Sequence, residues 1–327
     1  MGTLGRVAFF PGIRLHVVTG KGGTGKTTVA AALAVALSRG GKRVLVAEVE
    51  GRQGLAAVFG KGPLPHGETQ VTTTEGGGSV FAMPVDPERA LIEYLDLFYH
   101  LGRAGKLLQR MGATEFVTTI APGLRDVLLI GKVKEAVVRR AGSGRFYDAV
   151  VLDAPPTGRI VRFLGATDEV AQIAKVGPIR TQSEAVMALL RGDEAAVHLV
   201  TLLEEMPVQE TLDGVRQLTD AGLPVGAIVV NKVREERLAK ADLTRAAQGK
   251  LDLDAIGTAL ADAGIAEPGL AKVLAEEASE HARRVALQQA QRAELAELDL
   301  PLVELPLVPE AVDVGTVARL ADRFGTP

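Results

Sequence analysis

The feature that most constrains the fold of this chain is a glycine-rich run between an apolar segment and a helix. Residues 13–19 form a short apolar run that predicts a buried strand, and residues 27–39 are alanine-rich with helical spacing. Glycines between such elements let the backbone curl so that several N–H groups point at one phosphate chain. The run therefore predicts a phosphate-binding loop. It reads Gly20-Lys21-Gly22-Gly23-Thr24-Gly25-Lys26-Thr27 and is followed by Thr28.

Two side chains of this loop are assigned to the cofactors ATP and Mg²⁺. Lys26 is expected to reach the β- and γ-phosphates, and the Thr27 hydroxyl to bind Mg²⁺. The helix that begins near Lys26 adds the positive end of its dipole. A glycine-rich turn with a chance lysine is the alternative, but it leaves the flanking strand and helix unexplained. We expect all nine residues from Gly20 to Thr28 to contact the nucleotide.

Lys21 is the less usual residue of the loop, because it follows the first glycine directly. A lysine here marks the deviant Walker A subclass, in which two subunits enclose two nucleotides. In that subclass the lysine crosses the interface and adds positive charge as the transition state forms, as an arginine finger does. A solvated lysine is the plainer alternative. We interpret Lys21 as a catalytic residue that acts together with Lys26.

Further strands are predicted by apolar, β-branched runs at residues 43–48, 147–152, 198–203, 225–230 and 302–307. Most are separated from the next by a segment long enough for a crossover helix. The order of strand, glycine loop, helix and strand is a βαβ unit and implies a parallel sheet. We therefore expect an α/β fold, a P-loop nucleoside triphosphatase with a mostly parallel, doubly wound sheet.

Two helical stretches, residues 87–140 and 165–192, do not fit a simple alternation of strand and helix. We interpret them as insertions that build a helical subdomain within a single domain of 327 residues. Residues 234–298 are charged and helical in pattern, with breaks near Gly249 and Pro268.

Three acidic residues are candidates for the chemistry beside the phosphates. Asp153 ends an apolar strand and is expected to hold the Mg²⁺ shell together with Thr27. Glu48 and Glu50 end the second strand, where a carboxylate can orient the attacking water. We assign Glu50 as the catalytic base and keep Glu48 as the alternative. The competing interpretation is a pair of solvated carboxylates at a strand end.

Composition excludes several classes of function. The net charge of −3 gives no indication of a nucleic acid or an anionic membrane as partner. The absence of cysteine excludes disulfides and thiolate metal sites and fits a reducing cytosol. No run resembles a signal peptide or reaches the roughly 18 apolar residues of a membrane span. We expect a cytoplasmic protein.

Over nearly its full length the chain resembles the ATPases that drive arsenical pumps and deliver tail-anchored membrane proteins. The phosphate loop matches, residues 153–158 with 162–164 look like the second switch of that family, and residues 85–88 look like its entry into the helical subdomain. The resemblance implies that Asn231 recognises adenine and that an adenine loop spans residues 306–310. That loop supplies the expected contacts of Pro306 and Pro309.

The first switch departs from the usual family pattern of an aspartate followed by Pro-Ala-His-Asn. Glu50 takes the place of the aspartate, Gly51 that of the proline and Gln53 that of the histidine. Residues 48–54 are similar to the first switch of actinobacterial members that are found as paired paralogues. Without the cysteines of other members, we expect neither a zinc site nor an arsenite site.

The expected function is a dimeric ATPase that couples nucleotide-driven closure to a protein or membrane partner. The dimer forms with a second copy or with a paralogous ATPase, and a membrane protein is a possible client. Two alternatives stay open. One is a synthetase that phosphorylates a carboxylate substrate, and the other is a nucleotide-binding module with little turnover. The large helical insertion favours the first hypothesis, because a synthetase needs only a small acceptor pocket.

Overall fold

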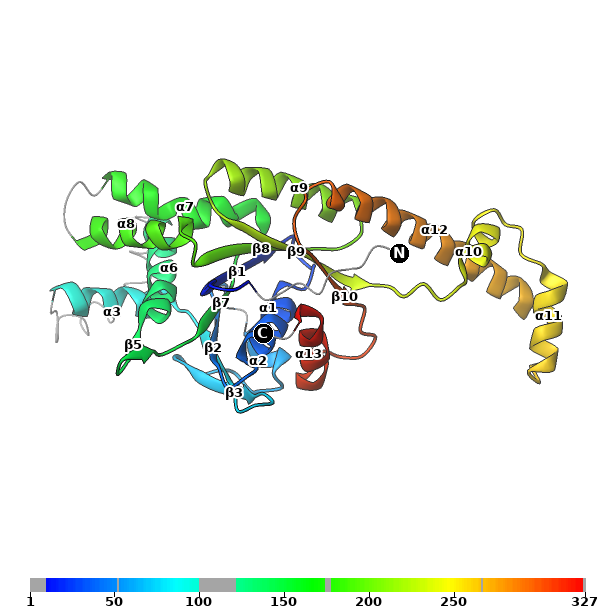
Figure 1. Ribbon diagram of the computed structural model, residues 1–327, viewed down its shortest axis with the longest axis horizontal. Helices are drawn as coiled ribbons and strands as arrows, with labels where there is room; N and C mark the ends of the chain where they lie inside the picture. The colour runs from blue at the N-terminus through cyan, green and yellow to red at the C-terminus, as the bar shows by residue number, and fades with distance from the viewer. Residues whose placement is uncertain (1–9, 52, 100–121, 174–177, 266, 326–327) are drawn as a thin grey trace.

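The computed structural model describes residues 10–51, 53–99, 122–173, 178–265 and 267–325 (Figure 1). In this described part, one eight-stranded sheet runs in the order β10-β9-β8-β1-β7-β2-β4-β3, and a separate hairpin pairs β5 with β6. The strands are β1 Leu15–Gly20, β2 Arg43–Glu48, β3 Thr69–Thr73, β4 Ser79–Pro84, β5 Arg140–Ala141, β6 Gly144–Arg145, β7 Ala149–Asp153, β8 Ala195–Thr201, β9 Val225–Val233 and β10 Leu302–Pro306. Every pair in the large sheet is parallel except the antiparallel β3 and β4.

Helices cover both faces of this sheet, as Figure 1 shows. The described helices are α1 Lys26–Ser38, α2 Gly54–Val58, α3 Pro87–Tyr99, α6 Pro122–Val138, α7 Thr157–Ile173, α8 Pro178–Arg191, α9 Glu205–Asp220, α10 Lys240–Ala247, α11 Leu253–Asp262, α12 Leu270–Ala296 and α13 Val314–Ala321, with a 3₁₀ turn at Asp322–Phe324. One core cluster joins the sheet to α1, α2 and α13, and a second joins its other face to α6, α7 and α8. The predicted α/β, doubly wound fold is confirmed.

The central strands are mostly apolar because both of their faces are covered. All six residues of β1 and all five of β7 are buried. The alanine-rich α1 packs closely against the sheet, and each residue from Val29 to Ser38 is buried. Small side chains allow this close approach, so the alanine content of α1 reflects burial on all sides rather than an amphipathic surface helix.

Helices α3, α6, α7 and α8 lie together at one end of the sheet (Figure 1). They come from the two stretches that predict a helical subdomain, except that α7 begins at Thr157, eight residues before the second stretch. Residues 100–121 and 174–177 of those stretches lie outside the described residues. We keep the division into one domain with a helical subdomain as an interpretation.

Two strands of the sheet, β3 and β4, are missing from the sequence prediction. Strand β3 forms the sheet edge, and its sequence, Thr-Gln-Val-Thr-Thr, buries only Val71. Such a strand carries little hydrophobic signal, because an edge strand leaves most of its side chains in solvent. Strand β8 begins at Ala195, three residues before the predicted position, and β9 ends at Val233, three residues after the predicted end. The other predicted strands lie within two residues of the observed ones.

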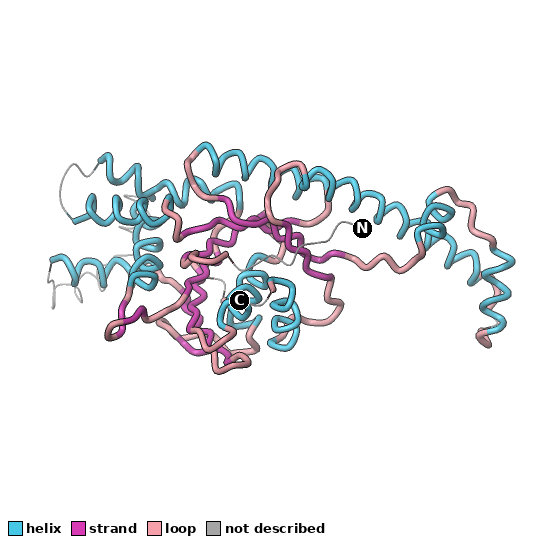
Figure 2. Tube along the Cα trace, in the orientation of Figure 1, coloured by secondary structure: helices cyan, strands magenta, loops and turns pink. Residues whose placement is uncertain are grey.

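Helices α10, α11 and α12 form a projection that we call the arm (Figure 2). The arm is inserted between β9 and β10, and its helices break near Gly249 and Pro268 as predicted. Helix α10 packs against α12, which gives the arm a small hydrophobic core of Leu243, Ala246, Ala282 and Val285. Among all the residues that the structure describes, no helix has the length and apolar character needed to cross a membrane.

Candidate functional site

The phosphate loop joins the buried end of β1 to the first turn of α1. Two of its glycines lie where no side chain fits. A Cβ on Gly20 would lie 2.2 Å from the carbonyl oxygen of Val200, and one on Gly25 would lie 2.4 Å from Asn231 Nδ2. Gly25 also has a φ of 92° and directly precedes Lys26, the first residue of α1. Glycine is therefore required at both positions, and Gly25 sets the start of the helix.

The end of β9 holds this loop in place. Asn231 is buried, and its Nδ2 donates a hydrogen bond of 2.8 Å to the carbonyl oxygen of Thr24. Lys232 Nζ donates to the carbonyl oxygen of Gly23 at 3.2 Å, and the Thr24 hydroxyl donates to that of Lys21 at 2.8 Å. In this structure Asn231 supports the backbone of the loop. Its recognition of adenine stays a prediction.

Three side chains, Thr27, Glu48 and Asp153, form what we call the inner wall of the site. The Thr27 hydroxyl donates to Asp153 Oδ2 at 2.6 Å. Asp153 and Glu48 end adjacent parallel strands, β7 and β2, and lie in register. Glu48 is buried and accepts from the backbone N–H groups of Gly54 at 3.0 Å and Leu55 at 3.4 Å, so it caps the start of α2. The two predicted metal-binding residues, Thr27 and Asp153, thus lie in direct contact.

The electrostatics of Asp153 fit a cation-binding carboxylate. Burial raises the pKa of Asp153 to about 6. The hydrogen bond from Thr27 lowers this pKa and the charge of Glu48 raises it, with smaller contributions from Lys26 and Glu50. A buried carboxylate surrounded by other carboxylates favours a bound cation, which would stabilise its ionised form. The hydroxyl and carboxylate oxygens of Thr27 and Asp153 are ligands that Mg²⁺ prefers, with phosphate and water oxygens completing the shell.

Glu50 lies two residues beyond β2, in an environment different from that of Glu48. It lines a cavity of about 140 Å³ between the strand ends and the helices α6 and α7. The cavity contains charges of both signs, since burial raises the pKa of Asp126 while Arg159, Arg125 and Arg162 lower it. Glu50 shares this cavity with Val49, Arg125, Asp126, Leu129, Pro155, Arg159 and Phe163. Of the two predicted bases, Glu50 therefore faces the helices α6 and α7, and Glu48 supports the backbone of α2.

A second surface, which we call the outer face, lies on the other side of the loop. It surrounds an open hollow of about 510 Å³. Lys21 Nζ forms an ion pair of 2.9 Å with Glu210 Oε1 of α9, and the two side chains are 31% and 40% exposed. The lysine is thus held away from its own loop and borders solvent. The outer face is lined by Lys21, Gly22, Pro156, Thr157, Gly158, Glu210, Asp213, Gly214 and Gln217.

The predicted adenine loop lies beside the strand that carries Asn231. Strand β10 ends at Pro306 next to Val233 of β9, and the Leu307 N–H donates to the carbonyl oxygen of Val233 at 2.8 Å. Pro309 follows in an exposed loop. The two segments assigned to the base are therefore adjacent, and their contacts with adenine stay a prediction.

The fold and this loop define a P-loop nucleoside triphosphatase, because the glycine loop joins a central parallel strand to a helix with a threonine and an aspartate in contact beyond it. A sequence profile described as Anion-transporting ATPase matches residues 13–191, more than half of the chain. The chain belongs to this family and is a nucleotide-binding ATPase. The family resemblance noted in the sequence is thus confirmed.

The chain is similar to several proteins that are named as ATPases. ATPase BagA of Mycobacterium tuberculosis is 50% identical over 315 residues, which cover 96% of this chain and 93% of the relative. A putative arsenical pump-driving ATPase of Aquifex aeolicus is 27% identical over 68% of this chain and 81% of its own length. ATPase GET3 of Lachancea thermotolerans is 28% identical over 58% of this chain and 55% of its own length.

Two residues of the site are missing from the sequence prediction. Glu210 contacts Lys21, but it is one of several acidic residues on an amphipathic helix and stands in no motif. Lys232 contacts Gly23 across 209 positions of the chain, and its adjacency to Asn231 is the only sequence signal that could have indicated it. Both contacts depend on which strands become neighbours in the sheet.

Proposed function

We propose that this ATPase is a Mg²⁺-dependent switch of two subunits that hydrolyses ATP at a shared interface. The observation that supports this most strongly is the position of Lys21. It belongs to the phosphate loop, yet its Nζ pairs with Glu210 on α9 at the edge of an open hollow. A charge that borders solvent in one subunit is available to a nucleotide held by another.

The phosphate loop, the inner wall and Glu50 together have the residues needed for the part of the reaction that occurs within one subunit. Lys26 and the loop backbone hold the phosphates, and Thr27 with Asp153 holds the cation. Mg²⁺, when bound, would neutralise charge on the phosphate oxygens. Glu50 orients the attacking water and accepts its proton. Glu48 keeps the first switch in place through its bonds to Gly54 and Leu55.

Lys21 provides the part that depends on a second subunit. On closure it leaves Glu210 and reaches the phosphates of the partner subunit's nucleotide, where negative charge develops in the transition state. The partner subunit is a second copy or a paralogue. The helical group, α3, α6, α7 and α8, transmits the conformational change of closure to a protein or membrane client. The cavity at Glu50 supports this path, because it joins the expected base to α6 and α7.

The cation assignment is tested by the magnesium response of hydrolysis. Thr27→Ala removes the hydroxyl ligand, and Asp153→Ala removes the carboxylate beside it, so each variant should need at least about tenfold more Mg²⁺ for half-maximal activity. The control is Thr72→Ala, which removes a hydroxyl on the edge strand β3. Magnesium titration of phosphate release measures the effect. A wild-type response in both site variants would exclude this pair as the metal site.

A further inference from the structure

The cavity that Glu50 lines has arginine side chains at its walls that the chain itself leaves without acceptors. Arg125 of α6 and Arg159 of α7 line it, and Arg162 lies about one turn further along α7. In the part of the chain that the structure describes, these three guanidinium groups form neither an ion pair nor a hydrogen bond, and the Nε of Arg125 is buried. Guanidinium nitrogens are donors only, and a buried donor without an acceptor needs an explanation. An anionic ligand with several oxygens would supply the acceptors.

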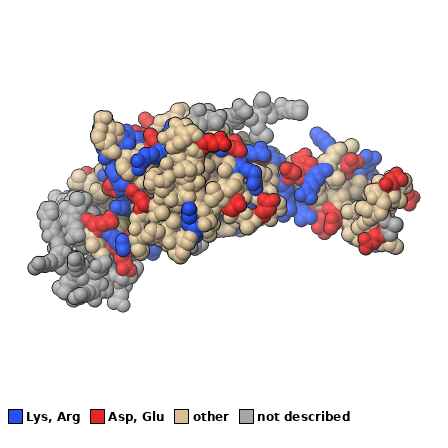
Figure 3. Space-filling model, turned by 90° about the horizontal axis from the view of Figure 1, so that it is seen from below, with Lys and Arg blue, Asp and Glu red and all other residues tan. Residues whose placement is uncertain are grey.

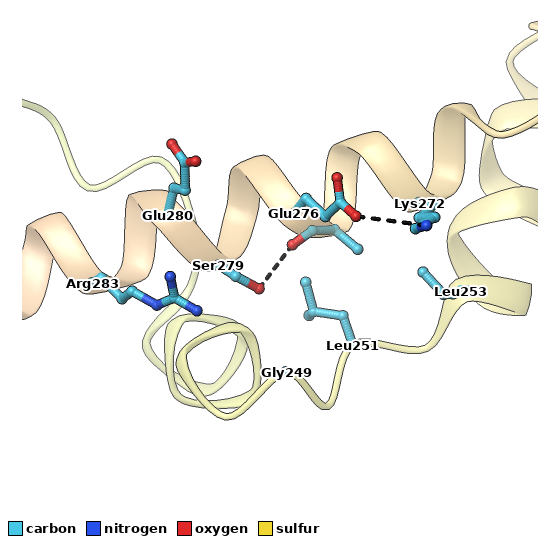
Figure 4. Close-up of a pocket in the computed structure, with 9 residues that line it drawn as sticks. Gly249, Leu251, Leu253, Lys272, Glu276, Ser279, Glu280 and Arg283 are labelled. Carbon is cyan, nitrogen blue, oxygen red and sulfur yellow. Dashed lines mark hydrogen bonds and ion pairs between the residues drawn. The ribbon is translucent and has the colours of Figure 1, made fainter.

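Many of the other cationic side chains lie close to acidic ones. Figure 3 shows Lys and Arg side chains beside Asp and Glu side chains over much of the face in view. In the groove of the arm, which has a volume of about 470 Å³, Lys272 forms an ion pair of 3.9 Å with Glu276 (Figure 4). The lysine of that groove has its counter-charge within the chain, whereas the arginines of the Glu50 cavity keep their donors for a ligand.

The Glu50 cavity adjoins the expected position of the terminal phosphate of ATP. Besides the arginines, it is lined by Glu50, the proposed base, and by Pro155, which follows the proposed metal ligand Asp153 by two residues. The Thr19 hydroxyl donates to the carbonyl oxygen of Pro155 at 2.7 Å, and Thr19 directly precedes Gly20 of the phosphate loop. One wall of the cavity is therefore bonded to the strand that leads into the loop.

The chemistry of hydrolysis directs the product toward this cavity. The water oxygen forms a bond to the γ-phosphorus, while the bond from that phosphorus to the bridging oxygen breaks and its electron pair stays on ADP. One proton of the water passes to Glu50, and the other stays on the product, hydrogen phosphate. Because the attack is in line, the phosphorus moves toward the attacking water and away from ADP. The product therefore forms on the side of Glu50, where the cavity lies.

We propose that this cavity is the first binding site of the released phosphate, with Arg125 and Arg159 as its charged ligands. The inference rests on the proposed role of Glu50 as the base. When the cavity is empty, two arginines face two carboxylates, Glu50 and Asp126, so the lining is neutral. Once Glu50 carries the proton of the water, one carboxylate remains against two arginines, and the lining attracts an anion. Hydrolysis thus creates the charge that holds phosphate between α6 and α7.

Equilibrium dialysis with radiolabelled inorganic phosphate tests this site without turnover. The full-length protein is first saturated with Mg²⁺ and ADP, so that the phosphate loop already holds its nucleotide. Arg125→Gln and Arg159→Gln should each raise the Kd of phosphate at least about tenfold, because each removes charge-assisted hydrogen bonds. Glu50→Gln should lower this Kd at least about threefold, because it removes the same negative charge that protonation removes.

Arg89→Gln is the matched control. It removes the charge of an exposed arginine on α3, which belongs to the helical group but lines a different cavity, so the Kd of phosphate should stay unchanged. Arg125 is partly buried and Arg159 is exposed, so the second substitution tests the site even if the first disturbs the fold. Circular dichroism checks the helix content of every variant.

Three results would overturn the proposal. The first is that phosphate does not bind to the protein loaded with Mg²⁺ and ADP. The second is an unchanged Kd in both arginine variants, which would leave the phosphate in the loop alone. The third is a raised Kd in Glu50→Gln, which would contradict the charge argument. Failure of the proposed function is recognised separately, because a Glu50→Gln variant that hydrolyses ATP at the wild-type rate would refute the base whatever its affinity for phosphate.

Discussion

The inner wall of the site and the outer face of the phosphate loop differ in how firmly the contacts within one subunit hold their side chains. On the inner wall, Thr27 is bonded to Asp153, and Glu48 accepts two backbone N–H groups, all within one subunit. On the outer face, Lys21 has an exposed ion pair with Glu210 beside an open hollow. The inner wall is built into the sheet, whereas the outer face is held by a contact that is weak in water.

This difference separates what a subunit does alone from what it does with a partner. Buried groups in fixed hydrogen bonds are preorganised for a ligand, since little has to move when the ligand arrives. An exposed lysine in a surface ion pair exchanges partners at low cost. We therefore expect the inner wall to determine nucleotide and metal binding, and the outer face to determine the rate of hydrolysis once a second subunit is present.

The largest effect is expected from Glu50, at the cavity behind the inner wall. Glu50→Gln removes the base but keeps its shape, so hydrolysis should fall by about 10²-fold or more while ATP still binds. Steady-state phosphate release and binding of a fluorescent nucleotide measure the two quantities. Glu48→Gln is the matched control and should cost less activity, because an amide oxygen still accepts from Gly54.

The two glutamates exchange roles if Glu50→Gln stays active and Glu48→Gln is inactive. If both variants hydrolyse ATP at the wild-type rate, neither glutamate is the base. Either result would change the assignment of the catalytic base at the end of β2.

A smaller effect is expected in the pH dependence of stability, which reports on the inner wall alone. Burial raises the pKa of Asp153 to about 6 in the folded protein, above its ordinary unfolded value. A carboxyl with a raised folded pKa binds more protons when folded, so the free energy of unfolding should fall as pH rises from about 4 to about 6, by up to about 3 kcal/mol. Urea unfolding without metal or nucleotide measures this slope.

Asp153→Asn should remove this part of the slope, so that the variant exceeds the parent in stability more at pH 7 than at pH 4.5. Saturating Mg²⁺ and ATP should also remove it in the parent, because the cation favours the ionised carboxylate. A variant with the same pH slope as the parent would show that the pKa of Asp153 is not raised in the folded protein. The electrostatic support for a cation at the inner wall would then be lost.

The smallest effect is expected on the outer face, from the partner of Lys21. Glu210→Gln removes the ion pair, which is worth about 0.2–1 kcal/mol at an exposed site, so turnover should rise by about 1.4-fold to fivefold. Asp213→Asn is the control, because Asp213 lines the same hollow but pairs with Arg216 at 3.1 Å. A lower turnover in Glu210→Gln would show that Glu210 helps Lys21 to act rather than restraining it.

The sequence predicted the inner wall better than the outer face, for a physical reason. The phosphate loop is one local segment, and Asp153 follows an apolar strand, so both can be recognised without knowledge of tertiary contacts. The central strands were predicted because they are buried on both faces. The edge strand β3 was missed because its mostly polar residues give little signal.

Long-range contacts explain the rest. The bond from Asn231 to Thr24 spans 207 positions, and no spacing in the sequence indicates that this asparagine supports the loop. Glu210 was missed because its role depends on where α9 lies relative to β1. The cap of α2 by Glu48 requires the chain to turn back on β2, and the sequence left Glu48 and Glu50 as alternatives for the same role.

The trans action of Lys21 is the central claim, and mixing two inactive variants tests it most directly. Lys21→Ala should bind ATP nearly normally and hydrolyse it poorly, whereas Lys26→Ala should bind ATP weakly. In a mixed dimer the Lys26→Ala subunit still offers its own Lys21 to the ATP held by its neighbour, so one working site reappears. Phosphate release should therefore recover on mixing, in a dimer shown by affinity tags to contain both variants. If the chain pairs only with a paralogue, the same test is run with that partner. No recovery in a verified mixed dimer would contradict the account and leave Lys21 as a contact to its own subunit's phosphates.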